Sequence, residues 1–134
     1  MHPRVPPTPP DGEKVRGIIT IGGQETDLVS GEKGHGEWFY EGGNHPGGPT
    51  SGRTRATTHV EGHAAGLMRK TGAKYGSLFL NKRPCGRGAA NCSTVLQKLL
   101  GPGQVLDVTF IDEVDSGRVK TWRFVGGIKR WKEL

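Results

Sequence analysis

Two apolar, β-branched segments in the second half of the chain lie very close together in the sequence. They are QVLDVTFID (104–112) and RVKTWRFVGG (118–127), and only about five residues separate them. A parallel pair of strands needs a crossover connection of a dozen or more residues. These two segments are therefore predicted to pair as antiparallel strands, and the rest of the fold must be built around that pair.

The other apolar segments alternate between strand-like and helix-like patterns. VRGIITI (15–21) and QETDLVS (24–30) flank a Gly-Gly pair and predict a hairpin. A helix is expected from His59 to Gly72, because glycine is a common C-terminal cap. The order β-β-α-β-α-β-β is completed by a strand at 75–81 and a second helix at 93–101, followed by a tail, IKRWKEL, that either forms a short helix or frays. This order predicts an α/β fold with a mixed sheet of about five strands and flanking helices.

Proline and glycine mark the segments that do not fit this pattern. Five of the first ten residues are proline, which predicts an extended linker over 1–14 and a single folded domain over 15–134. Residues 31–58 are rich in Gly, Pro, His and Thr, with Trp38, Phe39 and Tyr40 as their aromatic part, and are expected to be mostly loop. A loop of that length in a small domain is usually functional.

The charge balance is basic, with 19 Lys and Arg against 13 Asp and Glu and a formal net charge of +6. A small basic domain attracts polyanions such as nucleic acid, although solubility explains the charge equally well. No apolar stretch reaches the length of a membrane span and no signal peptide is evident, so we expect no membrane partner. We also expect a monomer. The two cysteines, Cys85 and Cys92, can form one bridge, remain free or bind a metal.

The stretch HVEGH (59–63) raises the question of a metal site. The protease motif H-E-x-x-H places glutamate beside the first histidine, whereas Glu61 lies two residues from each histidine and would point away from their shared helix face. A purely structural interpretation is a capping box, in which Thr58 and Glu61 satisfy backbone donors at a helix start. His63 is expected to be a structural helix residue.

A third interpretation is the zinc site of nucleobase deaminases, which use H-x-E followed downstream by P-C-x-x-C. His59 and Glu61 supply the first half, and Pro84, Cys85 and Cys92 resemble the second. One imidazole and two thiolates suit Zn²⁺ and leave a fourth position for water. The glutamate of that motif is not a ligand but transfers protons.

At these residues the sequence resembles the bacterial polymorphic-toxin DNA cytosine deaminases, the family that includes the double-stranded DNA deaminase toxin. The shared text is HVEGHAAGLMRKTGAKYGSLFLNKRPC, Cys92 and STVLQKLLGPGQVLDV, within a resemblance that covers 15–112 and is clearest over 57–108. The resemblance implies a cytidine-deaminase-like fold and hydrolysis of cytosine to uracil in DNA. It also implies the C-terminal domain of a secreted bacterial toxin that acts in the target-cell cytoplasm, with an immunity protein, plausibly acidic, as partner.

Carried over residue by residue, the resemblance makes His59, Cys85 and Cys92 the ligands of one zinc ion and Glu61 the general acid and base. Glu61 would take a proton from the attacking water and pass it to N3 of cytosine and then to the leaving ammonia. The family usually has C-x-x-C, whereas six residues separate the cysteines here, so Cys92 is the less certain ligand. A Cys85–Cys92 disulfide is the alternative.

Basic residues flank the candidate site on both sides in the sequence, as contacts to a nucleic-acid backbone require. Trp38 could stack on a base, with core packing as its alternative, and Asn81 could contact the sugar or the base. The candidate nucleic-acid-binding residues are Arg53, Arg55, Asn81, Lys82, Arg83, Arg87 and Trp38. A solvated basic surface is the simpler interpretation of the charges.

Three other functions stay open at the level of sequence. The first is a deaminase of RNA, nucleosides or adenine. The second is a basic nucleic-acid-binding domain stapled by a structural zinc, whose fourth ligand would be His35, His45 or His63. The third is a metal-free nuclease that uses those histidines as acid and base.

Overall fold

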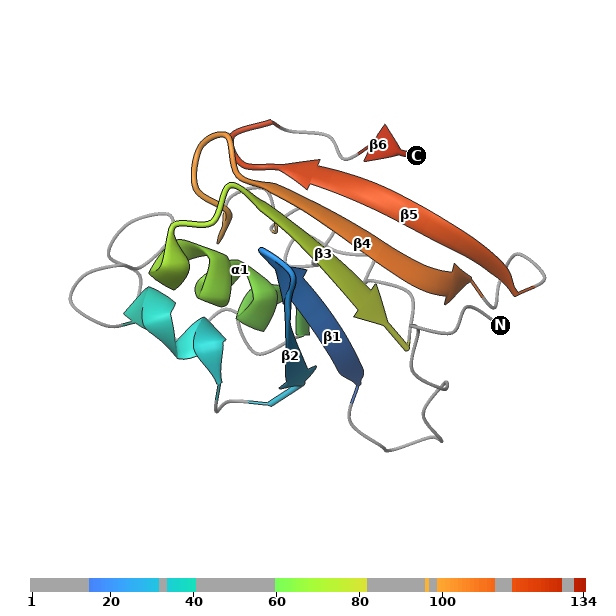
Figure 1. Ribbon diagram of the computed structural model, residues 1–134, viewed down its shortest axis with the longest axis horizontal. Coiled ribbons are helices and arrows are strands. Elements are labelled where there is room, and N and C mark those ends of the chain that lie inside the picture. The colour runs from blue at the N-terminus through green and yellow to red at the C-terminus, as the bar shows by residue number, and fades with distance from the viewer. Residues whose placement is uncertain are drawn as a thin grey trace.

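The strands of the protein form one mixed sheet. The computed structural model describes residues 15–31, 34–40, 60–81, 96, 99–112, 117–128 and 132–134. The six strands are β1 (Arg16–Ile21), β2 (Gln24–Val29), β3 (Tyr75–Leu80), β4 (Val105–Asp112), β5 (Arg118–Val125) and β6 (Lys132–Glu133). They lie in the order β2-β1-β3-β4-β5-β6 (Figure 1). Among the strands of the described residues, β3 and β4 are the only parallel pair. The predicted mixed sheet and the antiparallel pairing of its last two expected strands are confirmed.

The first two strands form the hairpin that the Gly-Gly pair predicts. Ile21 pairs with Gln24 across the turn. Gly22 and Gly23 have φ angles of 58° and 82°, and a two-residue turn with positive φ at both positions matches the twist of the strands that it joins. The predicted linker 1–14 lies outside the described residues.

One helix, α1 (Val60–Thr71), packs on one face of the sheet. Its residues Ala64, Ala65 and Met68 are fully buried and form a core with side chains from β1, β3, β4 and β5. Gly72 follows α1 with a φ of 70°, so the predicted glycine cap is confirmed. The helix is not long and apolar enough to cross a membrane, and the same holds for the other described helical residues.

The second predicted helix, at 93–101, is described only in part. Leu96 and Leu99 have helical backbone, and the amide of Leu100 donates to the carbonyl of Leu96 at 3.0 Å. All three leucines are buried in the same core as α1. The described residues therefore agree with a helix that packs on the face of the sheet that α1 covers.

Two segments differ from the sequence-based expectations. The tail was expected to form a helix or fray, but β6 pairs with the edge of β5, and the amide of Leu134 donates to the carbonyl of Thr121 at 2.8 Å. An edge strand offers unpaired backbone groups, and the tail satisfies some of them. Within the expected loop 31–58, a 3₁₀ helix, η1 (His35–Tyr40), forms beside α1, whereas 41–58 lie outside the described residues.

Candidate active site

The first turn of α1 sits directly on the sheet because β1 carries a glycine at the contact. A Cβ atom on Gly17 would lie 2.8 Å from Cγ1 of Val60 and 3.0 Å from Cδ2 of Leu80. Such distances leave no room for a side chain, so glycine permits the close approach. The contact fixes the N-terminus of α1 against the start of β1 and the end of β3.

Glu61, the predicted acid and base, lies in this first turn of α1 and is only 3% exposed. A carboxylate at a helix N-terminus is stabilised by the helix dipole, which offsets part of the cost of removing it from water. Thr58, its partner in the alternative capping box, lies outside the described residues. Glu61 is therefore a buried carboxylate at the start of a helix.

Asn81 follows β3 directly and is 5% exposed. Its Oδ1 accepts a hydrogen bond from the amide of Arg16 at 3.0 Å, and its own amide donates to the carbonyl of Arg16 at 3.2 Å. The bond from Arg16 identifies which side-chain atom is the oxygen. It thereby leaves the Nδ2 amino group as the donor for any further contact.

Glu61 and Asn81 are brought to the same end of the sheet. Glu61 follows Val60 in the sequence, and Asn81 follows Leu80. Val60 and Leu80 both lie next to the Cα atom of Gly17, where a side chain would otherwise be. This is the carboxyl end of the parallel strands β3 and β4, where open α/β sheets bind their ligands. Two predicted site residues from different elements therefore lie at the same end of the sheet.

His63, one turn further along α1, uses both ring nitrogens for the fold. It is 1% exposed, its Nδ1 accepts from the amide of Gly36 at 2.9 Å, and its Nε2 lies 2.8 Å from the carbonyl oxygen of Gly31. An amide donor at Nδ1 requires a lone pair there, so Nε2 carries the hydrogen and donates to Gly31. The expected structural role of His63 fits this arrangement, which leaves no nitrogen for a metal.

His35 lies where η1 meets α1. A Cβ atom on Gly66 would overlap the carbonyl group of His35, so only glycine allows the two backbones to touch. The Nδ1 atom of His35 is buried and has no hydrogen-bond partner among the residues that the structure describes. Burial is the largest effect that lowers the pKa of His35 below its usual value, and the positive charge of Lys70 acts in the same direction.

Trp38 belongs to the packing between η1 and α1. It is partly buried against the core, and the guanidinium carbon of Arg69 lies 5.6 Å from the centre of its ring. Arg69 is two turns beyond Glu61, which separates them by ~12 Å along the helix axis. This placement favours the core-packing alternative for Trp38 over stacking on a base beside Glu61.

The remaining predicted site residues lie outside the described residues. They are the zinc ligands His59, Cys85 and Cys92 and the basic residues Arg53, Arg55, Lys82, Arg83 and Arg87. Among the residues that the structure describes, no three His, Cys, Asp or Glu side chains gather as a metal site would require. Their roles therefore stay predictions.

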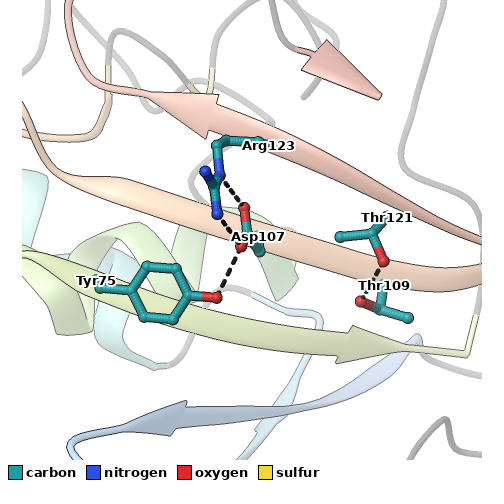
Figure 2. A network of polar contacts seen from close by, with 5 residues as sticks. All are labelled: Tyr75, Asp107, Thr109, Thr121 and Arg123. Atoms are coloured by element: carbon teal, nitrogen blue, oxygen red, sulfur yellow. Dashed lines mark hydrogen bonds and ion pairs between the residues drawn. The ribbon is translucent and has the colours of Figure 1, made fainter. Parts of the chain in front are cut away.

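The opposite face of the sheet carries a polar network that sequence reasoning missed (Figure 2). Asp107 of β4 accepts two bonds of 2.8 Å from Arg123 of β5 and one of 2.7 Å from the hydroxyl of Tyr75 on β3. Burial acts to raise the pKa of Asp107, but these donors hold it below its usual value. The bond to Asp107 raises the pKa of Tyr75. The alternation of apolar and polar residues in VLDVTFID could have predicted that Asp107 and Thr109 lie on the face opposite the core. Their hydrogen-bond partners could not be predicted, because they depend on the register of the strands.

The mixed sheet with α1 packed on one face is an α/β fold consistent with that of a deaminase. The sequence model of the SCP1.201-like deaminase family matches residues 2–125. The chain belongs to this family, and the fold and the general class of a hydrolytic deaminase are thereby established. No curated protein matches the sequence.

Proposed function

We propose that the protein is a zinc-dependent deaminase that converts cytosine to uracil in DNA. The observation that carries the proposal is the buried Glu61 at the first turn of α1, beside the end of β3, in a chain of a deaminase family. The sequence order H-x-E, P-C and a second cysteine supports zinc and a nucleobase substrate.

The donor set fits zinc, because one imidazole and two thiolates match its preferred ligands and charge. His59, Cys85 and Cys92 would hold the ion, which supplies an acidified water when bound. His59 directly precedes the first residue of α1, two positions before Glu61. The nearness of ligand and carboxylate in the sequence supports a shared site.

Glu61 performs the proton transfers in this proposal. It accepts a proton from the water that adds to C4 and delivers it to N3. It then takes the proton of the new hydroxyl group at C4 and passes it to the amino group, which leaves as ammonia when the C4–N bond breaks. Burial of the carboxylate keeps bulk water away from these steps. Asn81 offers its Nδ2 amino group to an acceptor on the base or the sugar.

The experiment compares wild type with Glu61→Gln on matched single- and double-stranded DNA that contains cytosine. Uracil is detected by glycosylase treatment and strand cleavage. We expect the variant to lose activity by ~10²-fold or more while its fold and zinc content are retained. Full activity in Glu61→Gln would contradict the proposed role of Glu61. Deamination of RNA or free cytidine but not of DNA would show that the substrate is not DNA.

The role as a secreted toxin domain with an acidic immunity protein is part of the same proposal. The proline-rich first segment and the net charge of +6 support it. Expression in a bacterial host that lacks uracil-DNA glycosylase should raise C-to-T mutation for wild type and not for Glu61→Gln. Equal mutation rates for the two proteins would contradict a role in DNA damage.

A further inference from the structure

The helix η1 lies directly on α1, without side chains between the two elements at their closest points. Gly66 of α1 leaves no room for a Cβ atom beside the carbonyl of His35. Gly34, just before η1, has a φ of 145°, and a Cβ atom on it would lie 2.8 Å from Cε1 of His63. A side chain at either position would separate the two elements. We call the approach of residues 31 and 34–40 to α1 the η1–α1 contact.

His63 takes part in this contact in a form that requires a neutral ring. Its Nδ1 accepts from the amide of Gly36 at 2.9 Å, and its Nε2 donates to the carbonyl of Gly31 at 2.8 Å. A proton on Nδ1 would remove the lone pair that the Gly36 amide needs and leave two N–H groups facing each other. Because His63 is only 1% exposed, the loss of this bond leaves a buried donor without its acceptor. Protonation of His63 therefore opposes the η1–α1 contact.

His35 is a second ring in the contact that is unfavourable as a cation. Its Nδ1 atom is buried and has no hydrogen-bond partner within the described part of the chain. Burial is the largest effect that lowers the pKa of His35, and the positive charge of Lys70 and a proton on His63 act in the same direction. Both cations belong to α1, so they repel a protonated His35 from the helix on which it lies. Protonation of His35 therefore opposes the contact as well.

The other charged groups of the neighbouring elements are placed differently. On α1, Arg69 lies over the ring of Trp38, and Glu61 lies two residues before His63, which is ~200° around the helix axis. The strands β1 and β2, next to α1, carry their charged side chains on the opposite face of the sheet, namely Arg16, Glu25 and Asp27. Three charged side chains of the same loop lie outside the described residues: Glu32, Lys33 and Glu37. Among the described residues, the charges that shift the pKa of His35 are therefore positive ones.

We propose that the η1–α1 contact is sensitive to acid: it is closed while His35 and His63 are neutral and opens when they take up protons, while the sheet stays folded. The inference goes beyond the proposed function and does not depend on it. Because α1 carries Glu61, opening would also remove one of the supports of the helix of the candidate site.

The pH range of the opening follows from proton linkage. The usual pKa of histidine is 6.5, and that of His35 is lower in the closed state. The open state therefore binds more protons as the pH falls below 6.5, and the closed state loses stability from there downward. For a ring that is protonated only in the open state, the open fraction rises roughly 25-fold between pH 7 and pH 5.

The amide of Gly36 reports on the contact directly, because its hydrogen bond to His63 is lost when the contact opens. We would measure its hydrogen exchange by NMR between pH 7 and pH 5, corrected for the intrinsic dependence of amide exchange on pH. The amide of Val108, in the buried strand β4, is the reference for the folded sheet.

Four variants test the groups that carry the inference. His35→Gln and His63→Gln each remove one titrating ring. Lys70→Gln removes the positive charge that acts on His35. Lys74→Gln is the matched control, because it removes another exposed lysine, which follows the end of α1.

We expect the exchange protection of Gly36 in wild type to fall by at least ~25-fold from pH 7 to pH 5, while that of Val108 is retained. The fall should be smaller in His35→Gln and in His63→Gln. Lys70→Gln should move the opening to lower pH, and Lys74→Gln should match wild type. If His63→Gln does not fold, His35→Gln and Lys70→Gln decide the question.

Protection of Gly36 that stays constant from pH 7 to pH 5 in wild type would overturn the inference. An equal loss of protection at Val108 would also overturn it, because acid would then unfold the whole domain and not this contact. The same holds if neither His35→Gln nor His63→Gln reduces the fall. None of these measurements involves deamination, so the proposed function is judged separately.

Discussion

Strand β4 is buried on both faces, but the two faces are held in different ways. On the side of α1, Leu106, Val108 and Phe110 are fully buried among apolar side chains. On the other side, Asp107 and Thr109 are 5% and 7% exposed and are held by hydrogen bonds to neighbouring strands. One face gains its stability from apolar area removed from water, and the other from directed bonds.

Both faces specify the register of the strands, but by different means. A slip of one residue would turn Leu106, Val108 and Phe110 away from the core. Asp107 lies directly opposite Arg123, and Thr109 directly opposite Thr121, in the pairing of β4 with β5. A slip of one residue would break both pairs. The polar face therefore fixes the strand positions on which the helices and the candidate site are built.

The largest expected effect comes from opening the apolar face. Phe110→Ala should lower the free energy of unfolding by ~3–5 kcal/mol, because it leaves a cavity and removes the edge-to-face contact with Trp122. Thr121→Ala on the polar face is the matched variant and should cost about 1 kcal/mol. Urea denaturation of both proteins measures the difference, and a larger loss from Thr121→Ala would reverse the comparison.

A smaller effect is expected where the core face meets the candidate site. Gly17→Val should destabilise the protein by ~1–3 kcal/mol, since the new side chain collides with Val60 and Leu80. It should also reduce deamination by more than the unfolded fraction explains, because the first turn of α1 is displaced with Glu61. If the activity per folded molecule equals that of wild type, the close contact between α1 and Gly17 is not needed to position Glu61.

The smallest effect is expected from the polar face and depends on pH. The pKa of Asp107 is lowered in the folded state, so its stabilising contribution is present above its usual value of 3.8 and is lost as the pH falls through the folded-state pKa. Asp107→Asn should cost about 1 kcal/mol at pH 7, since the exposure of Arg123 screens the interaction.

Unfolding of wild type and Asp107→Asn between pH 7 and pH 2.5 would follow this contribution directly. The gap between the two proteins should narrow in the acid part of that range. Tyr75→Phe is a useful control, because it removes one donor and keeps the carboxylate, and it should retain the pH dependence. If the difference in free energy of unfolding between the two proteins does not change with pH, the charge of Asp107 does not contribute to stability.

Much of the fold could be predicted because its strands and first helix have local signals. Gly22 and Gly23 identified the hairpin, and Gly72 identified the end of α1. Burial of Glu61 is consistent with its predicted role, since the motif H-x-E places it at a helix start.

The rest depended on contacts between distant residues. The docking of η1 follows from Gly66 and His63, which carry no local sign of the segment that they bind. The prediction that the tail forms a helix or frays was wrong, because β6 is a strand that forms by pairing with β5 and has no local sequence signal of its own. Likewise, Arg69 donates to the carbonyl of Leu99, and Gln104 donates to the carbonyls of Met68 and Ala73. No spacing in the sequence indicates these bonds.

The parallel pairing of β3 with β4 also bears on how the domain reaches its native state. Tyr75 pairs with Val105, so this contact closes a loop that contains residues 76–104, including both cysteines. Closing such a loop costs chain entropy before any contact rewards it, unlike the hairpin of β1 and β2. Two of the three candidate metal ligands, Cys85 and Cys92, thus lie inside this long-range closure, and a chain that has formed only its hairpins has not yet brought β3 and β4 together.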